Sequence, residues 1–389
     1  MKVTCDREKL LHAFQTAASV APTRSPKPIL QNVKLEARTD AVILMATDLE
    51  IGIRIDVPGM EVTVPGSIVL PISRFGLILR ESSDEKLYLE SDGRSTLVRG
   101  QRSEFRLPSE NPDEFPDVKG FEEEKYHELP ARFFREIVRR TAFATDNESS
   151  RYALGGVLLE LGEDCITAVG TDGRRLARQE GPVRAVGGQQ GPAEQRAPTN
   201  QPPAGAQGSG ETMTIVPTRA MNLLDKALAD NEEDIQLATR SNDILVKSGK
   251  TTIYSRLVEG RFPRWRDVFP HRDNPVRIDM VTGPFHAAVR QAMIVTSEER
   301  RGVDFTFAEG KVVLSCRGAE KGESHVELPV AYDGTPRVVT LDPRFVGDFL
   351  RVLDPEQTFV LELQDAESAV VCNTEDGYSY VIMPLARDR

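Results

Sequence analysis

The chain has 389 residues, of which 39% are hydrophobic, and its 49 Lys and Arg residues against 60 Asp and Glu residues give a formal net charge of −11. A chain of this length is expected to form two or three domains. The acidic balance counts against a simple nucleic-acid binder, although net charge does not say how charge is distributed over the surface. No run reaches the ~18 apolar residues of a membrane helix, and no signal peptide precedes the acidic N-terminal stretch. We therefore expect a cytoplasmic protein without a membrane partner.

The residue types that usually carry chemistry are scattered along the chain. The five histidines form no metal-binding pair, and the cysteines lack the paired spacing of a zinc or redox site. Gly249-Lys250-Thr251 ends like a phosphate-binding loop, but Ile244 stands where that loop needs its first glycine. We expect no enzyme, no metal and no cofactor, and we interpret the cysteines as buried thiols of a reducing compartment. These cysteines are Cys5, Cys165, Cys316 and Cys372.

The N-terminal third begins with an amphipathic helix, whose apolar residues recur at the spacing of one helical face. They are Leu10, Phe14, Ala17 and Ala18. Two strands are predicted next, at Ile29–Glu36 and Ala41–Ala46, and the second ends at Thr47-Asp48. A second helix is expected behind Pro71, because proline suits the start of a helix.

The same order of elements recurs twice more along the chain. The apolar helical faces of the second and third copies are Phe134, Val138, Thr141 and Ala142, then Phe285, Val289, Ala292 and Met293. The predicted strand pairs are Val157–Leu161 with Cys165–Val169, then Val303–Phe307 with Lys311–Ser315. The second helices begin at Pro217-Thr218-Arg219 and Asp342-Pro343-Arg344. Thr47-Asp48 recurs as Thr171-Asp172, which supports a repeat of about 120–125 residues.

One segment stands outside the repeat. Residues 187–210 consist mainly of Gly, Pro, Gln and Ala with no large apolar side chain, so we predict a disordered loop. Strand-like sequence on both sides indicates the tip of a hairpin, and a domain linker is the alternative. With this insert set aside, the predicted domains are residues 1–122, 123–272 and 273–389.

Each copy predicts an α+β domain with two helices packed on antiparallel sheet. Repeating such a domain leaves a sheet edge at each end of the array, and a head-to-tail partner could cover both edges and close a ring. Basic residues on the helices would line the inside of that ring, although each one alone could be an ordinary solvated side chain. They are Lys9, Arg135, Arg139, Arg219, Arg290 and Arg344.

Several segments resemble the signatures of the bacterial DNA polymerase III beta subunit, the replicative sliding clamp. They are Val169–Ala177 (VGTDGRRLA), Leu257–Pro263 (LVEGRFP) and Tyr380–Leu385 (YVIMPL), with Pro28-Ile29-Leu30, Thr47–Glu50 and 298–302 as further matches. The resemblance covers the chain outside the insert. It implies a ring-shaped homodimer of three domains per chain that encircles duplex DNA, without sequence preference, and confers processivity on the polymerase. The implied partners are the polymerase III alpha subunit, the clamp loader and other proteins with a clamp-binding motif.

The resemblance also implies three sets of site residues. The partner-peptide pocket would comprise Leu154, Thr171, Gly173, Arg174, Arg175, Leu176, Pro263, Val268, Val381, Ile382, Met383, Pro384 and Leu385. The DNA-facing residues would be Arg24, Lys27 and Arg219. The dimer interface would pair Phe105 and Leu107 with Ile294 and Val295, and Arg74 with Glu298. An apolar pocket rimmed by two arginines fits a short peptide with an apolar anchor and an acidic or polar flank.

Alternatives and departures from the family remain. Without the resemblance, Val381–Met383 is equally an ordinary buried strand, and Arg174-Arg175 an ordinary solvated pair. Arg174 stands where the family more often has histidine, Glu148 where it often has an uncharged polar residue, and the C-terminal tail is longer. The other functions considered are a repeat scaffold that closes by the same contact around a protein or glycan, and an enzyme with acids dispersed at the repeat junctions.

Overall fold

The computed structural model describes residues 1–146, 153–187, 212–228, 233–270, 275–297, 301–318 and 322–385. The chain forms two compact units. The first unit contains Met1–Arg135, Arg184–Gln207 and Arg219–Leu257, and the second contains Glu136–Val183, Gly208–Thr218 and Val258–Arg389. Helix α3 (Ala131–Thr141) begins in the first unit and ends in the second, and α4 (Thr218–Ala227) lies in the first unit apart from Thr218.

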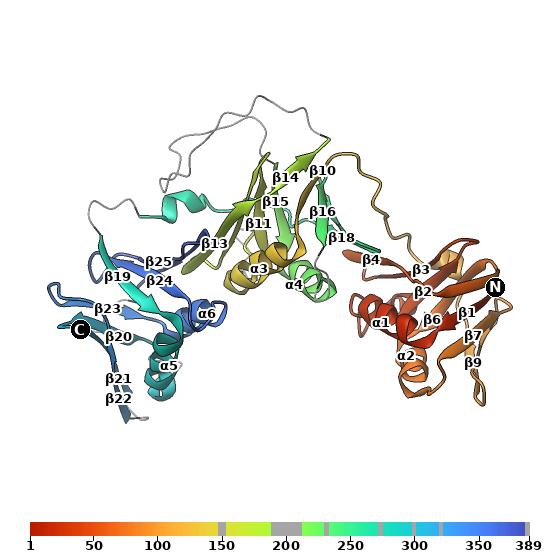
Figure 1. Ribbon diagram of the computed structural model, residues 1–389, viewed down its shortest axis with the longest axis horizontal. Helices are drawn as coiled ribbons and strands as arrows, with labels where there is room; N and C mark the ends of the chain where they lie inside the picture. The colour runs from red at the N-terminus through yellow and green to blue at the C-terminus, as the bar shows by residue number, and fades with distance from the viewer. Residues whose placement is uncertain are drawn as a thin grey trace. The chain divides into compact units, whose positions relative to one another are not determined.

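The first unit is built on two antiparallel sheets (Figure 1). The nine-stranded sheet has the order β14-β10-β16-β17-β18-β4-β3-β2-β6, and the five-stranded sheet has the order β5-β1-β7-β8-β9. The strands are β1 (Lys2–Asp6), β2 (Asn32–Ala37), β3 (Val42–Thr47), β4 (Ile51–Asp56), β5 (Met60–Val64), β6 (Gly66–Pro71), β7 (Lys86–Ser91), β8 (Ser95–Arg99), β9 (Glu104–Pro108), β10 (Tyr126–Pro130), β14 (Arg184–Val186), β16 (Asp234–Thr239), β17 (Asp243–Ser248) and β18 (Thr251–Arg256).

The second unit also has two antiparallel sheets. The eight-stranded sheet has the order β15-β11-β12-β13-β26-β25-β24-β19, and the four-stranded sheet has the order β22-β21-β20-β23. The strands are β11 (Gly156–Leu161), β12 (Cys165–Thr171), β13 (Arg175–Pro182), β15 (Thr212–Pro217), β19 (Val276–Val281), β20 (Val303–Ala308), β21 (Lys311–Gly318), β22 (Gly322–Pro329), β23 (Arg337–Leu341), β24 (Thr358–Leu363), β25 (Val370–Asn373) and β26 (Tyr378–Ile382).

The helices cover the sheets as the periodicity predicts. In α1 (Arg7–Ala18) the predicted apolar face is buried except at the half-buried Ala18, and Phe14 meets Phe75 of α2 (Ile72–Glu81) edge to face with ring centroids 5.1 Å apart. Figure 1 shows the corresponding pair in the second unit, α5 (Thr282–Ala292) beside α6 (Pro343–Arg351). Asp342 caps α6 by accepting from the Arg344 N–H, and Pro343 is the first helical residue. The predicted α+β class is confirmed.

Two predictions about local structure are wrong. Ile29 does not lie in a strand, because Pro28 starts a short 3₁₀ helix, η1 (Pro28–Gln31), and β2 begins only at Asn32. The strands on either side of the insert do not form a hairpin: β14 pairs with β10, whereas β15 pairs with β11 in another sheet. A hairpin needs its two strands to be hydrogen-bonded neighbours, so the insert is not a hairpin tip. The predicted disorder of the insert concerns residues 188–210, which lie outside the described part of the chain, as do Glu148 and Glu298.

The repeated Thr-Asp dipeptide forms the same turn in both units. The Thr47 hydroxyl donates to the Ile51 carbonyl (2.7 Å), and Asp48 Oδ1 accepts from the Glu50 and Ile51 N–H groups. The Thr171 hydroxyl likewise donates to the Arg175 carbonyl (2.6 Å), and Asp172 Oδ1 accepts from the Arg174 and Arg175 N–H groups. The third residue of each turn has a positive φ, 81° in Leu49 and 84° in Gly173. The residues that follow each turn begin the next strand of the sheet, β4 at Ile51 and β13 at Arg175.

Candidate partner-docking site

The centre of the predicted pocket is the pairing of β13 with β26 in the second unit. Antiparallel register sets Arg175 opposite Ile382 and Leu176 opposite Val381. One step further along, the Met383 N–H donates to the Arg174 carbonyl (2.9 Å), so these two residues are also opposed. Residues separated by some two hundred positions in the sequence are therefore neighbours at the Thr171–Arg175 turn. This part of the predicted pocket is brought together by the fold.

A segment that we call the strap, residues 258–270, crosses one face of this sheet. Two backbone hydrogen bonds attach the strap to the rest of the unit. The Val258 N–H donates to the Ile215 carbonyl (2.8 Å), and the Ala153 N–H donates to the Arg261 carbonyl (3.3 Å). The strap side chains Phe262 and Trp265 form one buried cluster with sheet residues that include Leu176 and Val381. Pro263 and Val268 are thereby held beside the β13–β26 pairing.

The strap is fixed by a buried carboxylate that the sequence analysis did not identify. Glu160 of β11 is only 3% exposed, and it accepts from the Trp265 ring N–H (3.1 Å) and from two guanidinium nitrogens of Arg266 (2.9 and 2.7 Å). A buried carboxylate is stable only when paired and hydrogen-bonded, which Arg266 and Trp265 provide. The signal available in the sequence was a glutamate inside the otherwise apolar strand Gly156–Leu161.

The predicted pocket residues divide into an exposed and a buried set. Met383 is 44% exposed, Val268, Gly173 and Arg174 are exposed, and Pro263, Pro384 and Leu385 are half-buried. The remaining apolar and hydroxyl residues are buried within the unit: Leu154, Thr171, Leu176, Val381 and Ile382. The predicted pocket residues are thus only partly exposed.

Ile382 and Leu385 contact parts of the second unit other than the strap. Side chains alternate across a strand, so Val381 faces the strap whereas Ile382 enters the core that contains Phe349 and Phe285. The Leu385 N–H donates to the Thr340 carbonyl (2.9 Å), which attaches the end of the described chain to β23. Ile382 therefore supports the sheet from its other face.

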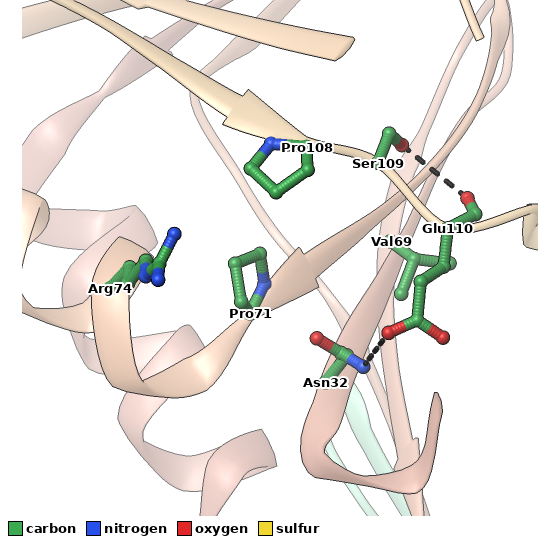
Figure 2. Close-up of a pocket in the computed structure, with 7 residues that line it drawn as sticks. All are labelled: Asn32, Val69, Pro71, Arg74, Pro108, Ser109 and Glu110. Carbon is green, nitrogen blue, oxygen red and sulfur yellow. Dashed lines mark hydrogen bonds between the residues drawn. The ribbon is translucent and has the colours of Figure 1, made fainter. Parts of the chain in front are cut away.

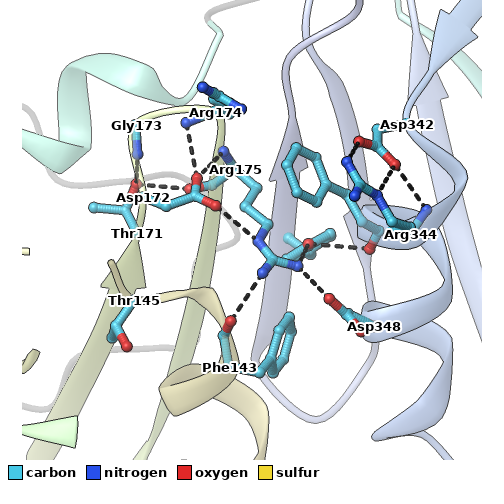
Figure 3. Close-up of polar contacts among 12 residues, drawn as sticks. Phe143, Thr145, Thr171, Asp172, Gly173, Arg174, Arg175, Asp342, Arg344 and Asp348 are labelled. Carbon is cyan, nitrogen blue, oxygen red and sulfur yellow. Dashed lines mark hydrogen bonds and ion pairs between the residues drawn. The ribbon is translucent and has the colours of Figure 1, made fainter. Parts of the chain in front are cut away.

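Arg175 is a largely buried structural contact. Its guanidinium, 10% exposed, donates to Asp348 of α6 (2.6 Å), to the Phe143 carbonyl (2.9 Å) and to Asp172 (3.1 Å), as Figure 3 shows. Burial alone would lower the pKa of Arg175, but Tyr380, Asp348 and Asp172 outweigh it and hold the pKa above its ordinary value. This arginine ties the turn of β12–β13 to α6.

Arg174 behaves in the opposite way. Its backbone is fixed by Asp172 and Met383, but its side chain is exposed and points away from Arg175 and Asp348 (Figure 3). Within the described part of the chain Arg174 forms no ion pair, whereas Arg178 pairs with Glu180 and Arg264 pairs with Asp267. Of the two predicted rim arginines, Arg174 is thus exposed, whereas Arg175 is held within the unit.

The predicted DNA-facing residues lie in the first unit. Arg24 and Lys27 are exposed in the loop that precedes η1. Arg219 of α4 instead forms an ion pair with the turn carboxylate of Asp48 and donates to the Val20 carbonyl (3.3 Å). Its charge is therefore largely compensated within the unit, while those of Arg24 and Lys27 face solvent.

The predicted dimer residues occupy sheet edges and surface apolar positions. Strand β9 is the outermost strand of the five-stranded sheet, and on it Phe105 is 41% exposed whereas Leu107 is buried at 6%. Leu107 thus packs inside its own unit. Ile294 is 74% exposed in η5 (Met293–Val295), and the half-buried Val295 packs against the core of the second unit.

Two cavities adjoin these residues in the first unit. A cavity of 320 Å³ contains Arg74 and Glu110, and Figure 2 shows Glu110 accepting a hydrogen bond from the buried Asn32. A second cavity, of 510 Å³, opens between α2 and the segment before β9 and is lined by Leu77, Ile78 and Phe105 among others. Exposed apolar side chains therefore gather beside the free edge of β9.

The described residues contain no group of three or more His, Cys, Asp or Glu side chains placed to hold a metal ion. Cys5, Cys316 and Cys372 are buried, and burial raises the pKa of the Cys5 thiol to about 12 and that of the half-buried Cys165 to about 11. Across the same described ranges, no helix is long and apolar enough to cross a bilayer.

Comparison with known proteins accounts for nearly the whole chain. Family models of the DNA polymerase III beta subunit match in order: the N-terminal domain over residues 1–119, the central domain over 128–190 and 201–264, and the C-terminal domain over 266–386. The beta sliding clamps of Chlamydia pneumoniae and Pseudomonas putida are each 28% identical to the chain, over 99% of its length and 99% and 100% of theirs. The sliding clamp structure of Bacillus subtilis covers the whole of both chains with a TM-score of 0.88 at 22% identity, a likeness of fold. The chain belongs to the DNA polymerase III beta subunit family.

Proposed function

We propose that this protein is a DNA sliding clamp, a non-enzymatic processivity factor that closes as a ring-shaped homodimer around duplex DNA. The observation that carries the proposal is the succession of three beta-subunit domains over almost the entire chain. The domains are taken as residues 1–122, 123–272 and 273–389, and the place of action as the cytoplasm. A ring holds DNA by topology, so it needs few strong phosphate contacts and tolerates an acidic exterior.

The docking surface for partner proteins is the exposed part of the site in the second unit. Met383 offers a flexible apolar contact, the strap adds Pro263 and Val268, and Arg174 adds a positive charge. The polymerase III alpha subunit, the clamp loader and other proteins with a clamp-binding motif are the partners in this proposal. Each would insert a short peptide segment beside Met383.

Two further surfaces complete the proposed clamp. Arg24, Lys27 and Arg219 face the DNA, and Arg219 also pairs with Asp48. Phe105 on the free edge of β9 and the exposed Leu77 of the neighbouring cavity meet the Ile294 segment of a second copy. An exposed strand edge with apolar side chains is otherwise an aggregation risk, which an obligate partner removes.

Loading onto nicked circular DNA with a clamp loader and ATP tests the function directly. A clamp held by topology should remain on the closed circle at high salt and slide off once the circle is cut at one site. Retention on the linear DNA would contradict topological tethering. Since high salt removes electrostatic binding, the difference between circle and linear DNA isolates the topological component.

The dimer is tested by the mass of the protein in solution. We expect wild type to have the mass of two chains and Ile294→Asp to be a monomer with an unchanged circular dichroism spectrum. The matched control is Val281→Asp, another exposed apolar position of the same unit, which should remain dimeric. A wild-type protein that is monomeric at all working concentrations would refute the ring.

A further inference from the structure

We propose that Glu160 is a positioning residue for partner docking, because it holds the strap in the place where Pro263 and Val268 are presented to a partner. The inference rests on the proposed docking function and adds to it a residue that a partner cannot touch. Glu160 lies on β11 and is 3% exposed, so it acts only through the strap residues that it binds.

The later part of the strap depends on side chains for its attachment. Among the described residues, backbone hydrogen bonds join the strap to the rest of the unit at Val258 and Arg261, both near its start. Beyond Arg261 the strap backbone bonds to itself, as in the bond from the Trp265 N–H to the Pro263 carbonyl (2.8 Å). The position of the exposed Val268 is therefore set by side-chain contacts.

The polar contacts of this part of the strap meet at Glu160. Its carboxylate accepts from the Trp265 ring N–H (3.1 Å) and from both terminal nitrogens of Arg266 (2.9 and 2.7 Å). The Arg266 guanidinium also lies over the Trp265 ring, 4.4 Å from its centroid. Carboxylate, guanidinium and indole thus contact one another, and a single buried charge fixes two neighbouring strap residues. We call these three side chains the Glu160 cluster.

The first unit has a carboxylate at the same place and uses it differently. Glu36 of β2 corresponds to Glu160, since the two strands pair with the following strands in equal register and lead to the same Thr-Asp turn. Glu36 forms an ion pair with the nearby Arg38 (2.7 Å). The segment that crosses the first sheet is held elsewhere, by the pair of Lys119 with Asp243 of β17. The repeated fold therefore does not require this carboxylate to bind a crossing segment.

The Glu160 cluster sets the fraction of molecules whose strap lies in the position that docking requires. The Arg266 side chain is 50% exposed, so once the charge of Glu160 is removed it can turn to water and release the strap. A partner then binds only the molecules with the strap in place, and its apparent affinity falls by that fraction. Contacts in the docked complex stay the same, so the loss lies in the association rate, whereas a lost direct contact speeds dissociation.

The test compares Glu160→Gln with Glu36→Gln, the same change at the same place in the other unit. The polymerase III alpha subunit is passed over each immobilised full-length protein in a surface plasmon resonance experiment. We expect Glu160→Gln to bind about three- to tenfold more weakly, through slower association at an unchanged dissociation rate. Glu36→Gln should bind as wild type does. Acrylamide should quench Trp265, the single tryptophan, more strongly in Glu160→Gln than in wild type.

A second pair of variants approaches the cluster from its exposed side and decides the matter if Glu160→Gln does not fold. Arg266→Lys keeps a positive charge beside Glu160 and should bind the alpha subunit nearly as wild type does, whereas Arg266→Gln should associate more slowly. Circular dichroism checks that each variant is folded.

The outcomes separate this inference from the docking function. Wild-type association rates in folded Glu160→Gln and in Arg266→Gln would overturn the inference alone, because docking itself would stand. Faster dissociation at an unchanged association rate would also overturn it, since that result indicates a direct contact. An equal loss in Glu36→Gln would assign the effect to general destabilisation and overturn it as well. Failure of wild type to bind the alpha subunit would overturn the docking function and the inference together.

Discussion

The junction of β4 with β18 in the first unit and the junction of β13 with β26 in the second are two versions of one scaffold. Both follow a Thr-Asp turn, both end in an equivalent backbone bond, and both are crossed by a segment with a buried phenylalanine followed by proline, Phe115-Pro116 and Phe262-Pro263. The side chains differ. The first junction ends in an ion pair of Glu50 with Arg256, whose N–H donates to the Glu50 carbonyl (2.9 Å), whereas the second ends in an exposed methionine and an unpaired arginine.

The turn carboxylates show a second contrast between the junctions. Asp48 is paired with Arg219, a side chain that is largely exposed on α4, whereas Asp172 is paired with the buried Arg175, which also reaches Asp348. An exposed ion pair is worth little, while a buried charge that loses one partner is costly. The comparison teaches that the repeat duplicates the backbone, and that burial and a few side chains decide which copy is held rigidly and which surface can bind.

The largest expected effect is the loss of the buried arginine. Arg175→Ala leaves Asp348 and Asp172 without their shared cation, so we expect unfolding of the second unit to become easier by about 3–5 kcal/mol. Trp265 is the single tryptophan of the chain and lies in the strap, so its fluorescence in a urea titration reports on this unit. Arg219→Ala is the control, with an expected loss of about 1 kcal/mol or less followed by circular dichroism. Equal losses of stability in Arg175→Ala and Arg219→Ala would contradict the difference between the two turn carboxylates.

Exchange of the opposed residues tests which junction binds. Met383→Arg gives the second junction the residue of the first, and we expect it to weaken peptide or polymerase binding by at least about 2 kcal/mol, the size of an interface hot spot. The urea midpoint should not change, because Met383 is exposed. The companion variant Arg256→Met alters the first junction and should leave binding as it is. Undiminished binding by Met383→Arg would show that the docking surface is misplaced.

The turns allow a smaller, backbone-level comparison. Leu49 has a positive φ that suits glycine, so Leu49→Gly should stabilise the first unit or leave it unchanged, whereas Gly173→Ala should destabilise the second by about 1 kcal/mol. Nothing lies within 4 Å of the Cβ that Gly173→Ala would add, so steric conflict does not confuse the result. Urea titrations of both variants, followed by circular dichroism and by Trp265 fluorescence, measure the change in stability of each unit. A stability gain in Gly173→Ala would contradict the strain argument.

The smallest effect concerns pH. Burial would raise the pKa of Asp376, but Arg140 and the hydroxyl of Thr374 lower it below its ordinary value of 3.8. Because the folded pKa is depressed, this carboxylate stabilises the second unit above pH 3.8, and the stabilisation is lost as pH falls through the folded pKa. Asp376 is 44% exposed, so we expect Asp376→Asn to cost about 1 kcal/mol or less at neutral pH and nothing in strong acid. If the stability difference between wild type and Asp376→Asn persists in strong acid, the loss comes from packing and not from the charge of Asp376.

The sequence predicts the elements of this fold better than their surroundings. Helical periodicity located α1, α3 and α5, and the recurrence of Thr-Asp identified two identical turns, because both signals are local. Arg174 and Arg175 look alike in the sequence, yet one is exposed and the other buried, since burial depends on Asp348 far along the chain. Ile382 could have been assigned to the far face from strand alternation alone. Glu160 needed its distant partner Arg266 to be recognised as a contact that fixes the strap.

The sheets of this protein do not end where its domains end. The nine-stranded sheet joins strands of the N-terminal and central domains through β4 and β18, and the eight-stranded sheet joins the central and C-terminal domains through β13 and β26. Cutting the chain at the family boundaries would leave four strands with unpaired N–H and C=O groups. Unpaired edge strands pair with those of other molecules, so we expect excised single domains to aggregate. The two compact units alternate along the chain, and their boundary falls within α3, so neither unit is one continuous segment that could be excised instead.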